Sequence, residues 1–491
     1  MKIFLAKLTS LWKKNQFLIF CLLLALILRL PSLFEPYWYG DEGVYLTLGQ
    51  AVRRGLVLYR DIHDNKPPFL YWLAALADSL FWMKFLLGIA GLSAIVLFSK
   101  LAEIIFGQKQ RIIKWAVLIF TLLITLPLAE GNIANAENFL IFFTIAGFYL
   151  LLHKEKITPD LAFLIGICFS FALLFKVPAG ADFGAAVIFL LFFQNKNSPR
   201  LLFPLLAGFC LPVLTTILYY FSRNGLSDYL NAAFWQNLGY LSSWQTGTHT
   251  NRTLPLALLF RAGVLLILIF FLWLKKRRFS LYFNLTLLWF FFSLFAATLS
   301  GRPYSHYLLE VVPSFCLLLG FVLDKPAVQQ KRWLLFSFGL LALVIASFRF
   351  WFYPTFSYYG NFLDLAIGKK SRNDYFSWFN PAVNRNYEVS NFIVNHTNKD
   401  DKIFVWGDEP FIYCLSRRQP AGKYVVAYHI IDYHGQAITN QALIENKPKL
   451  IIKITSKKEA FPELESLLEK NYQLLTTIKD AKIYLFLNKP L

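Results

Sequence analysis

Long apolar runs separated by short polar segments fill most of the chain up to about residue 353. A run of about 17–25 apolar residues crosses a bilayer as an α-helix, because a helix satisfies its own backbone hydrogen bonds in lipid. The pattern therefore predicts about eleven membrane-spanning helices, at residues 17–34, 84–105, 112–128, 137–153, 158–175, 179–194, 200–221, 256–274, 280–299, 307–323 and 333–353.

The short gaps between these runs alternate in charge. Residues 275–278 read KKRR, for example, whereas residues 129–136 contain neither Lys nor Arg. Basic loops are typical of the cytoplasmic side of a membrane protein, so the N-terminus is predicted to be cytoplasmic. An odd number of spans then places residues 34–83, 222–255 and 354–491 outside. We expect a multi-pass protein of the plasma membrane with an extracytoplasmic C-terminal region.

From about residue 385 the apolar runs shorten and charges become more frequent. This change predicts a small α/β domain at residues 385–491, because short β-prone runs alternate with helical patterns. An interfacial linker rich in Tyr, Phe and Asn, at residues 354–384, would join it to a membrane domain at residues 1–353. The predicted strands are 402–406, 449–455, 472–478 and 482–488, and the predicted helices are 385–397, 434–445 and 459–470.

Composition agrees with a membrane protein. The chain is 57% apolar and only 16% charged, against roughly 25% charged residues in soluble domains. Its net charge of +20 is spread over loops and is not gathered into a basic nucleic-acid module, so we expect no nucleic-acid partner. Four of its five cysteines lie in apolar runs, which argues against a disulfide framework or a cysteine metal site. A Gly-rich phosphate loop is absent from the sequence, so an activated, lipid-linked substrate is the expected energy source.

Charged residues gather in the first predicted outer loop, between two long apolar runs. Asp41 and Glu42 are adjacent there, just after the first span. One of the pair could accept a proton from a substrate hydroxyl, and a carboxylate could also bind a divalent cation. The other interpretations are a solvated loop end, or an N-cap for a helix that begins near Val44.

The same loop contains Lys66, followed by two prolines that stiffen the chain. A lysine ammonium is a compact positive charge that suits a phosphate. His63 could be a ligand or a proton carrier, or simply a solvated side chain.

Three further segments add candidates. Arg302 and His306 lie in a very short outer loop, where Arg302 could bind a phosphate or extend to water from the interface. Glu137 opens a span, where it could stabilise the helix dipole or face a cavity. Lys176 lies in a tight outer turn and could be a phosphate contact or an interfacial anchor.

Four motifs together resemble one known family: GDEGVY (40–45), KPPFLYW (66–72), AENF (136–139) and GRPYSHYLLEVVP (301–313). The chain resembles the bacterial glycosyltransferase family 39-like proteins. These are relatives of the dolichyl-phosphate-mannose-protein mannosyltransferases and of the aminoarabinose and galacturonosyl transferases of lipid A. The resemblance covers nearly the whole chain and implies a GT-C membrane fold and a polyprenyl-phosphate sugar as donor.

The resemblance also implies roles for individual residues. Asp41 matches the proposed general base, with Glu42 as its acidic neighbour, and Lys66 matches a donor-phosphate contact. Arg302 and His306 match a late loop that lines the cavity in such enzymes. The remaining candidate substrate-binding residues are Glu137, Lys176 and Tyr45.

A metal ion is a further expectation from the resemblance. Asp41 and His306 are possible ligands of Mg²⁺ or Mn²⁺. Some relatives carry an acidic residue just before the lysine, where it helps to hold a metal, but this chain has Asn65 there.

The function predicted from the sequence is an inverting glycosyltransferase at the outer face of the plasma membrane, in contact with membrane lipids. It would move a sugar from a polyprenyl-phosphate donor to a hydroxyl of a lipid, glycan or protein. One alternative is a lipid or ion transporter, although transporters usually place charges within their spans and this chain has few there. Another alternative is a non-catalytic glycan-binding membrane protein.

Overall fold

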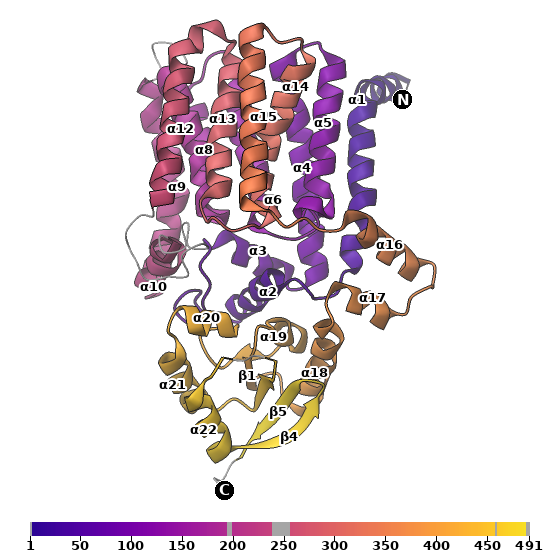
Figure 1. Cartoon of the computed structure of the whole chain (residues 1–491), viewed down its shortest axis with the longest axis vertical. Coiled ribbons are helices and arrows are strands. Elements are labelled where there is room, and N and C mark those ends of the chain that lie inside the picture. Colours follow the sequence, from indigo (N-terminus) through magenta and orange to yellow (C-terminus); the bar gives the residue numbers. More distant parts are fainter. Residues whose placement is uncertain (1, 194–198, 238–255, 457–458, 488–491) are drawn as a thin grey trace. The chain divides into compact units, whose positions relative to one another are not determined.

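The computed structural model describes residues 2–193, 199–237, 256–456 and 459–487 (Figure 1). The chain forms two compact units. The first comprises residues 1–32, 84–216 and 237–355, and the second comprises residues 33–83, 217–236 and 356–491. The predicted first outer loop and the C-terminal region therefore belong to the same unit.

The first unit is built from long apolar helices that run side by side in Figure 1. Its elements are α1 (Lys2–Arg29), α4 (Leu80–Phe106), α5 (Gln110–Thr125), η2 (Pro127–Ala129), α6 (Ala136–His153), α7 (Pro159–Phe175), η3 (Val177–Ala179), α8 (Gly180–Phe192), α9 (Pro199–Ser222), α12 (Leu256–Lys275), η6 (Lys276–Arg278), α13 (Leu281–Thr298), η7 (Ser305–Glu310), α14 (Val312–Leu323) and α15 (Val328–Phe348).

Among the described residues, seven helical segments are long and apolar enough to cross a membrane. Three shorter apolar helices accompany them, at Pro159–Phe175, Val177–Phe192 and Val312–Leu323. Each predicted apolar run falls on a helix, so the prediction of a helical, multi-pass membrane protein is confirmed. Fewer helices are long and apolar enough to cross a membrane than the eleven predicted spans, because α5, α7, α8 and α14 are short.

Small residues allow two of these helices to approach closely. A Cβ atom placed on Gly208 of α9 would lie 1.9 Å from the carbonyl oxygen of Phe163 in α7. Lipid supplies no hydrophobic driving force between helices, so close backbone packing at small residues stabilises such crossings instead.

The second unit combines short helices with a sheet. It contains α2 (Gly40–Arg53), α3 (Phe69–Ala77), α10 (Leu226–Leu230), the π-helical turn η4 (Asn231–Trp235), α16 (Thr355–Ala366), α17 (Arg372–Phe379), α18 (Ala382–His396), β1 (Lys402–Trp406), α19 (Phe411–Ser416), β2 (Gln419–Pro420), α20 (Ala427–Asp432), α21 (Gln436–Asn446), β3 (Leu450–Ile454), α22 (Pro462–Asn471), β4 (Tyr472–Ile478) and β5 (Ala481–Phe486). The boundary between the units falls within the helices η1 (Leu30–Phe34), α4, α9 and α16. Residues 80–83 of α4 and residues 217–222 of α9 belong to the second unit.

The sheet has the strand order β2-β1-β3-β5-β4. β1 pairs in parallel with β2 and β3, and β5 pairs antiparallel with β3 and β4. Trp406, Ile451 and Leu464 belong to its buried core. The small C-terminal α/β fold predicted from the sequence is thus confirmed. β2, α19 and α20 were not predicted, because each is too short to give a recognisable hydropathy pattern. The predicted linker at residues 354–384 contains the two helices α16 and α17.

Close packing of α2 on α3 gives a testable prediction. A Cβ atom on Gly49 of α2 would lie 2.6 Å from the backbone carbon of Ala74 in α3, and backbone cannot move aside as a side chain can. We expect Gly49→Ala to destabilise the protein by about 1–3 kcal/mol and to lower its melting temperature. Gly88→Ala is the matched control, because its Cβ would meet nothing within 4 Å. An unchanged melting temperature for Gly49→Ala would contradict this packing.

Candidate active site

Asp41, Tyr45 and Lys66 lie together in the second unit, and we call these three residues the first-loop cluster. Helix α2 begins at Gly40, earlier than the predicted start near Val44, so Asp41 lies in its first turn. Tyr45 follows one turn later on the same face, and its hydroxyl donates to Asp41 Oδ2 at 2.9 Å. Burial, together with the Asp41 carboxylate, raises the pKa of Tyr45 well above its ordinary value, so this donor stays protonated.

The N-cap interpretation of the acidic pair is wrong, because the N-cap of α2 is Tyr39. Asp41 remains partly accessible, with 38% of its side chain exposed. Glu42 is only 1% exposed. Consecutive residues of an α-helix point about 100° apart, so the two carboxylates do not share one face of α2.

Lys66 supplies the positive charge of the first-loop cluster. Its Nζ lies 3.6 Å from Asp41 Oδ2 and 4.9 Å from the centre of the Tyr45 ring. Its backbone is held on both sides: the Tyr59 hydroxyl donates to its carbonyl at 2.7 Å, and its N–H donates to the Tyr71 hydroxyl at 3.3 Å. Helix α3 then begins directly after Pro68. The two prolines of the KPP motif therefore stiffen the chain between Lys66 and the start of α3, where proline is common.

Asp64 is a site residue that the sequence analysis did not single out. It is 3% exposed, and its Oδ1 lies 3.8 Å from His429 Nε2. Burial raises the pKa of this carboxyl, but Lys66, His429 and hydrogen bonds from Tyr71 and the Asn65 N–H outweigh burial and lower it. Asp64 therefore adds a second negative charge near Lys66. Its partner His429 is distant in the sequence, so a local motif could not reveal it.

His63 is buried rather than solvated, so the solvated interpretation is wrong. It is 3% exposed, and its ring centre lies 4.9 Å from that of Tyr433 and 5.3 Å from that of Tyr424. Burial, assisted by the nearby His429, lowers the pKa of His63 to about 3. The imidazole is therefore neutral at physiological pH and packs among aromatic rings.

Four residues of the first unit form a second group, which we call the span-end cluster: Glu130, Glu137, Lys176 and His306. Glu137 lies in the first turn of α6 and forms an ion pair with Lys176, which follows α7. His306, in η7, lies with Nε2 3.8 Å from Glu137 Oε1 and with Nδ1 2.7 Å from Glu130 Oε2. Lys176 also lies over the Tyr307 ring, with 3.7 Å from Nζ to the ring centre. These contacts turn Lys176 and Glu137 toward each other, and only 15% of the Lys176 side chain is exposed.

Glu130 is the member that the sequence analysis missed. Its backbone is left-handed, with φ +59°, which is uncommon for a residue other than glycine. Its carboxylate is held by Asn135 Nδ2 at 2.9 Å as well as by His306. Such strained backbone tends to be found at functional sites. In the sequence, the segment that contains Glu130 is notable only for its lack of basic residues. No sequence motif therefore indicates that Glu130 is a site residue.

The charges of the span-end cluster are balanced. Burial lowers the pKa of His306, but the carboxylates of Glu130 and Glu137 outweigh burial and raise it above its ordinary value. A protonated His306 and Lys176 then face two carboxylates, so the group is compact and overall close to neutral.

Arg302 lies in the turn between α13 and η7. Its side chain is half-buried, and its backbone N–H donates to Ser300 Oγ at 3.2 Å. A metal ion remains a prediction. Within the described ranges, no group of three or more His, Cys, Asp or Glu side chains is arranged to hold one. The residues around Asp41 Oδ2 are a phenol and an ammonium group, which do not fit a cation.

Comparison with solved structures identifies the fold. The crystal structure of ArnT from Cupriavidus metallidurans bound to undecaprenyl phosphate matches with a TM-score of 0.59 and 14% identity, over 97% of this chain and 99% of that chain. The apo state of the same protein matches with a TM-score of 0.57 and 13% identity, over 96% and 98%. Residues 384–487 match the family described as "Putative competence-induced protein Ccs4 C-terminal domain". No curated protein sequence matches the chain.

The likeness to both ArnT structures extends over nearly the whole length of each chain. This protein is therefore a multi-pass membrane protein with the fold of the GT-C glycosyltransferases. At 14% identity the likeness defines the fold, and the chemistry must be argued from the two clusters.

Proposed function

We propose that the protein transfers a sugar from a polyprenyl-phosphate donor to a hydroxyl acceptor, at the outer face of the plasma membrane. The observation that carries this proposal is the pairing of Asp41 with Lys66, 3.6 Å apart, in a membrane protein of the GT-C fold. A partly exposed carboxylate beside a cation offers a base for the acceptor and a partner for a phosphate. The undecaprenyl phosphate bound to ArnT supports a polyprenyl-phosphate donor.

Asp41 is the proposed general base. Its contacts with Tyr45 and Lys66 both reach Oδ2, so Oδ1 is the oxygen that would receive the acceptor proton. As that proton moves to Asp41, the acceptor oxygen forms a bond to the anomeric carbon and the bond from that carbon to the phosphate oxygen breaks. Displacement from the face opposite the phosphate inverts the configuration. Glu42, being buried, is proposed as an acidic neighbour of the base.

Lys66 is proposed to change partner when the donor binds. In the structure its ammonium group pairs with Asp41. The donor phosphodiester carries one negative charge, as a carboxylate does, and its two unesterified oxygens would compete for that ammonium group. The flexible lysine stem allows the exchange. Lys66 would then stabilise the second negative charge that the phosphate gains as its bond to the sugar breaks, as a cation beside a leaving group does.

The span-end cluster is proposed to bind substrate as well. Lys176 and His306 are cations held by Glu137 and Glu130, and Arg302 lies a few residues before His306. A phosphate or sugar hydroxyl could exchange with these carboxylate contacts. We place no step of the reaction on this cluster.

Membranes from cells with and without the protein test the function. We expect cells that contain it to convert a polyprenyl-phosphate sugar to free polyprenyl phosphate, and to gain a new sugar on a surface lipid, glycan or protein, as seen by mass spectrometry. A transporter or a glycan-binding protein would leave the total amount of the lipid-linked sugar unchanged, and that result would overturn the proposal.

A further inference from the structure

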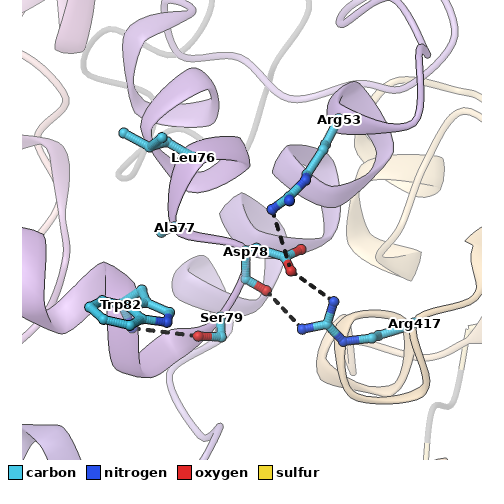
Figure 2. A pocket seen from close by; sticks show the side chains of 7 residues that line it. All are labelled: Arg53, Leu76, Ala77, Asp78, Ser79, Trp82 and Arg417. Carbon is cyan, nitrogen blue, oxygen red and sulfur yellow. Dashed lines mark hydrogen bonds and ion pairs between the residues drawn. The ribbon is translucent and has the colours of Figure 1, made fainter.

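A polar pocket of about 310 Å³ lies in the second unit, at the turn between α3 and α4 (Figure 2). Its lining includes Arg53 from the end of α2, Arg417 from the end of α19, and Asp78 from the turn itself. Leu76 and Trp82 form its apolar part. The pocket therefore combines two cations with apolar surface.

Asp78 holds the two guanidinium groups toward one point, as Figure 2 shows. Arg417 Nη1 donates to Asp78 Oδ2 at 2.8 Å, and Arg53 Nη1 lies 3.5 Å from the same oxygen. A guanidinium has five N–H donors. Because 58% of the Arg53 side chain and 52% of the Arg417 side chain are exposed, donors of both remain accessible to a ligand.

The neighbourhood of the pocket has a net positive charge. Arg54 joins the group by donating from Nη2 to the Arg417 carbonyl at 2.8 Å. Two arginines thus contact Asp78, and a third lies beside Arg417. An anion with several oxygens is the ligand that this arrangement favours, because guanidinium groups bind phosphate in a bidentate manner.

The pocket also lies where a membrane span ends. Helix α4 begins at Leu80 and is one of the helices able to cross a membrane. Next to this end, Leu76 is 71% exposed and Trp82 is 52% exposed. Tryptophan is enriched at the level of lipid headgroups. Cations beside exposed apolar side chains at this level match a ligand with an anionic headgroup and acyl chains.

We propose that this pocket binds the phosphate headgroup of an anionic membrane lipid. Its arginines contact the phosphate oxygens, and Leu76 and Trp82 contact the adjoining part of the acyl chains. The site is separate from the first-loop cluster, because Asp41 and Arg53 occupy opposite ends of α2, about 18 Å apart along the helix axis. A lipid bound here attaches the end of α2 and the end of α19 to the membrane surface.

The test is native mass spectrometry of the purified full-length protein with phosphatidylglycerol. Arg53→Gln is the first variant, since Arg53 is exposed and its contact with Asp78 is long, so the fold is expected to survive. We expect phosphatidylglycerol binding to weaken about fivefold in Arg53→Gln, and further in Arg53→Gln/Arg417→Gln. Arg372→Gln, an exposed arginine of the same unit, is the matched control and should bind normally.

Two further ligands distinguish the source of the phosphate. Phosphatidylcholine should bind more weakly than phosphatidylglycerol, and millimolar inorganic phosphate should fail to displace bound lipid. Displacement by inorganic phosphate would show that the pocket takes a free oxyanion and would overturn the lipid assignment. Equal phosphatidylglycerol binding by the wild type and the double variant would overturn the site itself. Sugar transfer is not used as the readout, so failure here leaves the proposed function standing.

Discussion

Replacing Asp41 by Asn is expected to reduce the rate of sugar transfer by roughly 10²–10⁴-fold, the usual contribution of a general base. An amide at this position keeps the size of the side chain and can still accept the Tyr45 hydroxyl bond, but it cannot take up the acceptor proton. The loss should therefore appear in kcat, with little change in the KM of the donor. Turnover of a lipid-linked donor by purified protein measures both.

The control for this variant is Asp400→Asn, which changes an exposed aspartate of the same unit. It should keep normal turnover. If Asp41→Asn also keeps near-normal turnover while its melting temperature is unchanged, Asp41 is not the base. If its melting temperature collapses, the rate must be measured with Asp41→Glu, which retains a carboxylate and should retain part of the activity.

Lys66→Met is expected to weaken donor binding by roughly tenfold to a hundredfold, because a hydrogen bond to a charged group contributes about 1.5–3 kcal/mol. The change keeps most of the side-chain volume against the Tyr45 ring and removes only the ammonium group. Titration of the purified protein with undecaprenyl phosphate measures this loss of affinity. Lys66→Arg keeps the charge and should bind the lipid more tightly than Lys66→Met. Equal affinity of wild type and Lys66→Met would rule out a phosphate contact at this residue.

Lys66→Met also separates the two proposed roles of this lysine. If the lysine merely holds Asp41 in place, its loss should lower kcat without changing the affinity for undecaprenyl phosphate. If it binds the donor phosphate, the affinity falls as well. The partner exchange proposed above predicts that both quantities change.

The membrane architecture could be predicted from the sequence because hydropathy acts locally. Each membrane-spanning helix needs its own run of apolar residues, so the runs predict helices such as α4, α6 and α13. The strands β1 and β4 were predicted at their observed residues for a similar reason, since β-prone side chains cluster in each. β2 contains only Gln419 and Pro420 and leaves no pattern to read.

The grouping of site residues could be predicted only in part. Asp41 and Tyr45 lie one helical turn apart, so a local motif contains both. Lys66 joins them because the prolines that follow it start α3, which packs on α2. Glu130 and Asp64, in contrast, depend on His306 and His429, which are far along the chain. Long-range ion pairs of this kind have no sequence period, and only the folded structure reveals them.

The anomeric configuration of the product tests the central claim most directly. Purified protein would be given a polyprenyl-phosphate sugar of known configuration and a hydroxyl acceptor, and NMR would be used to assign the product. A single base at Asp41 opposite the leaving phosphate predicts complete inversion together with release of one polyprenyl phosphate per sugar transferred. Retention of configuration, or transfer without release of polyprenyl phosphate, would contradict this account.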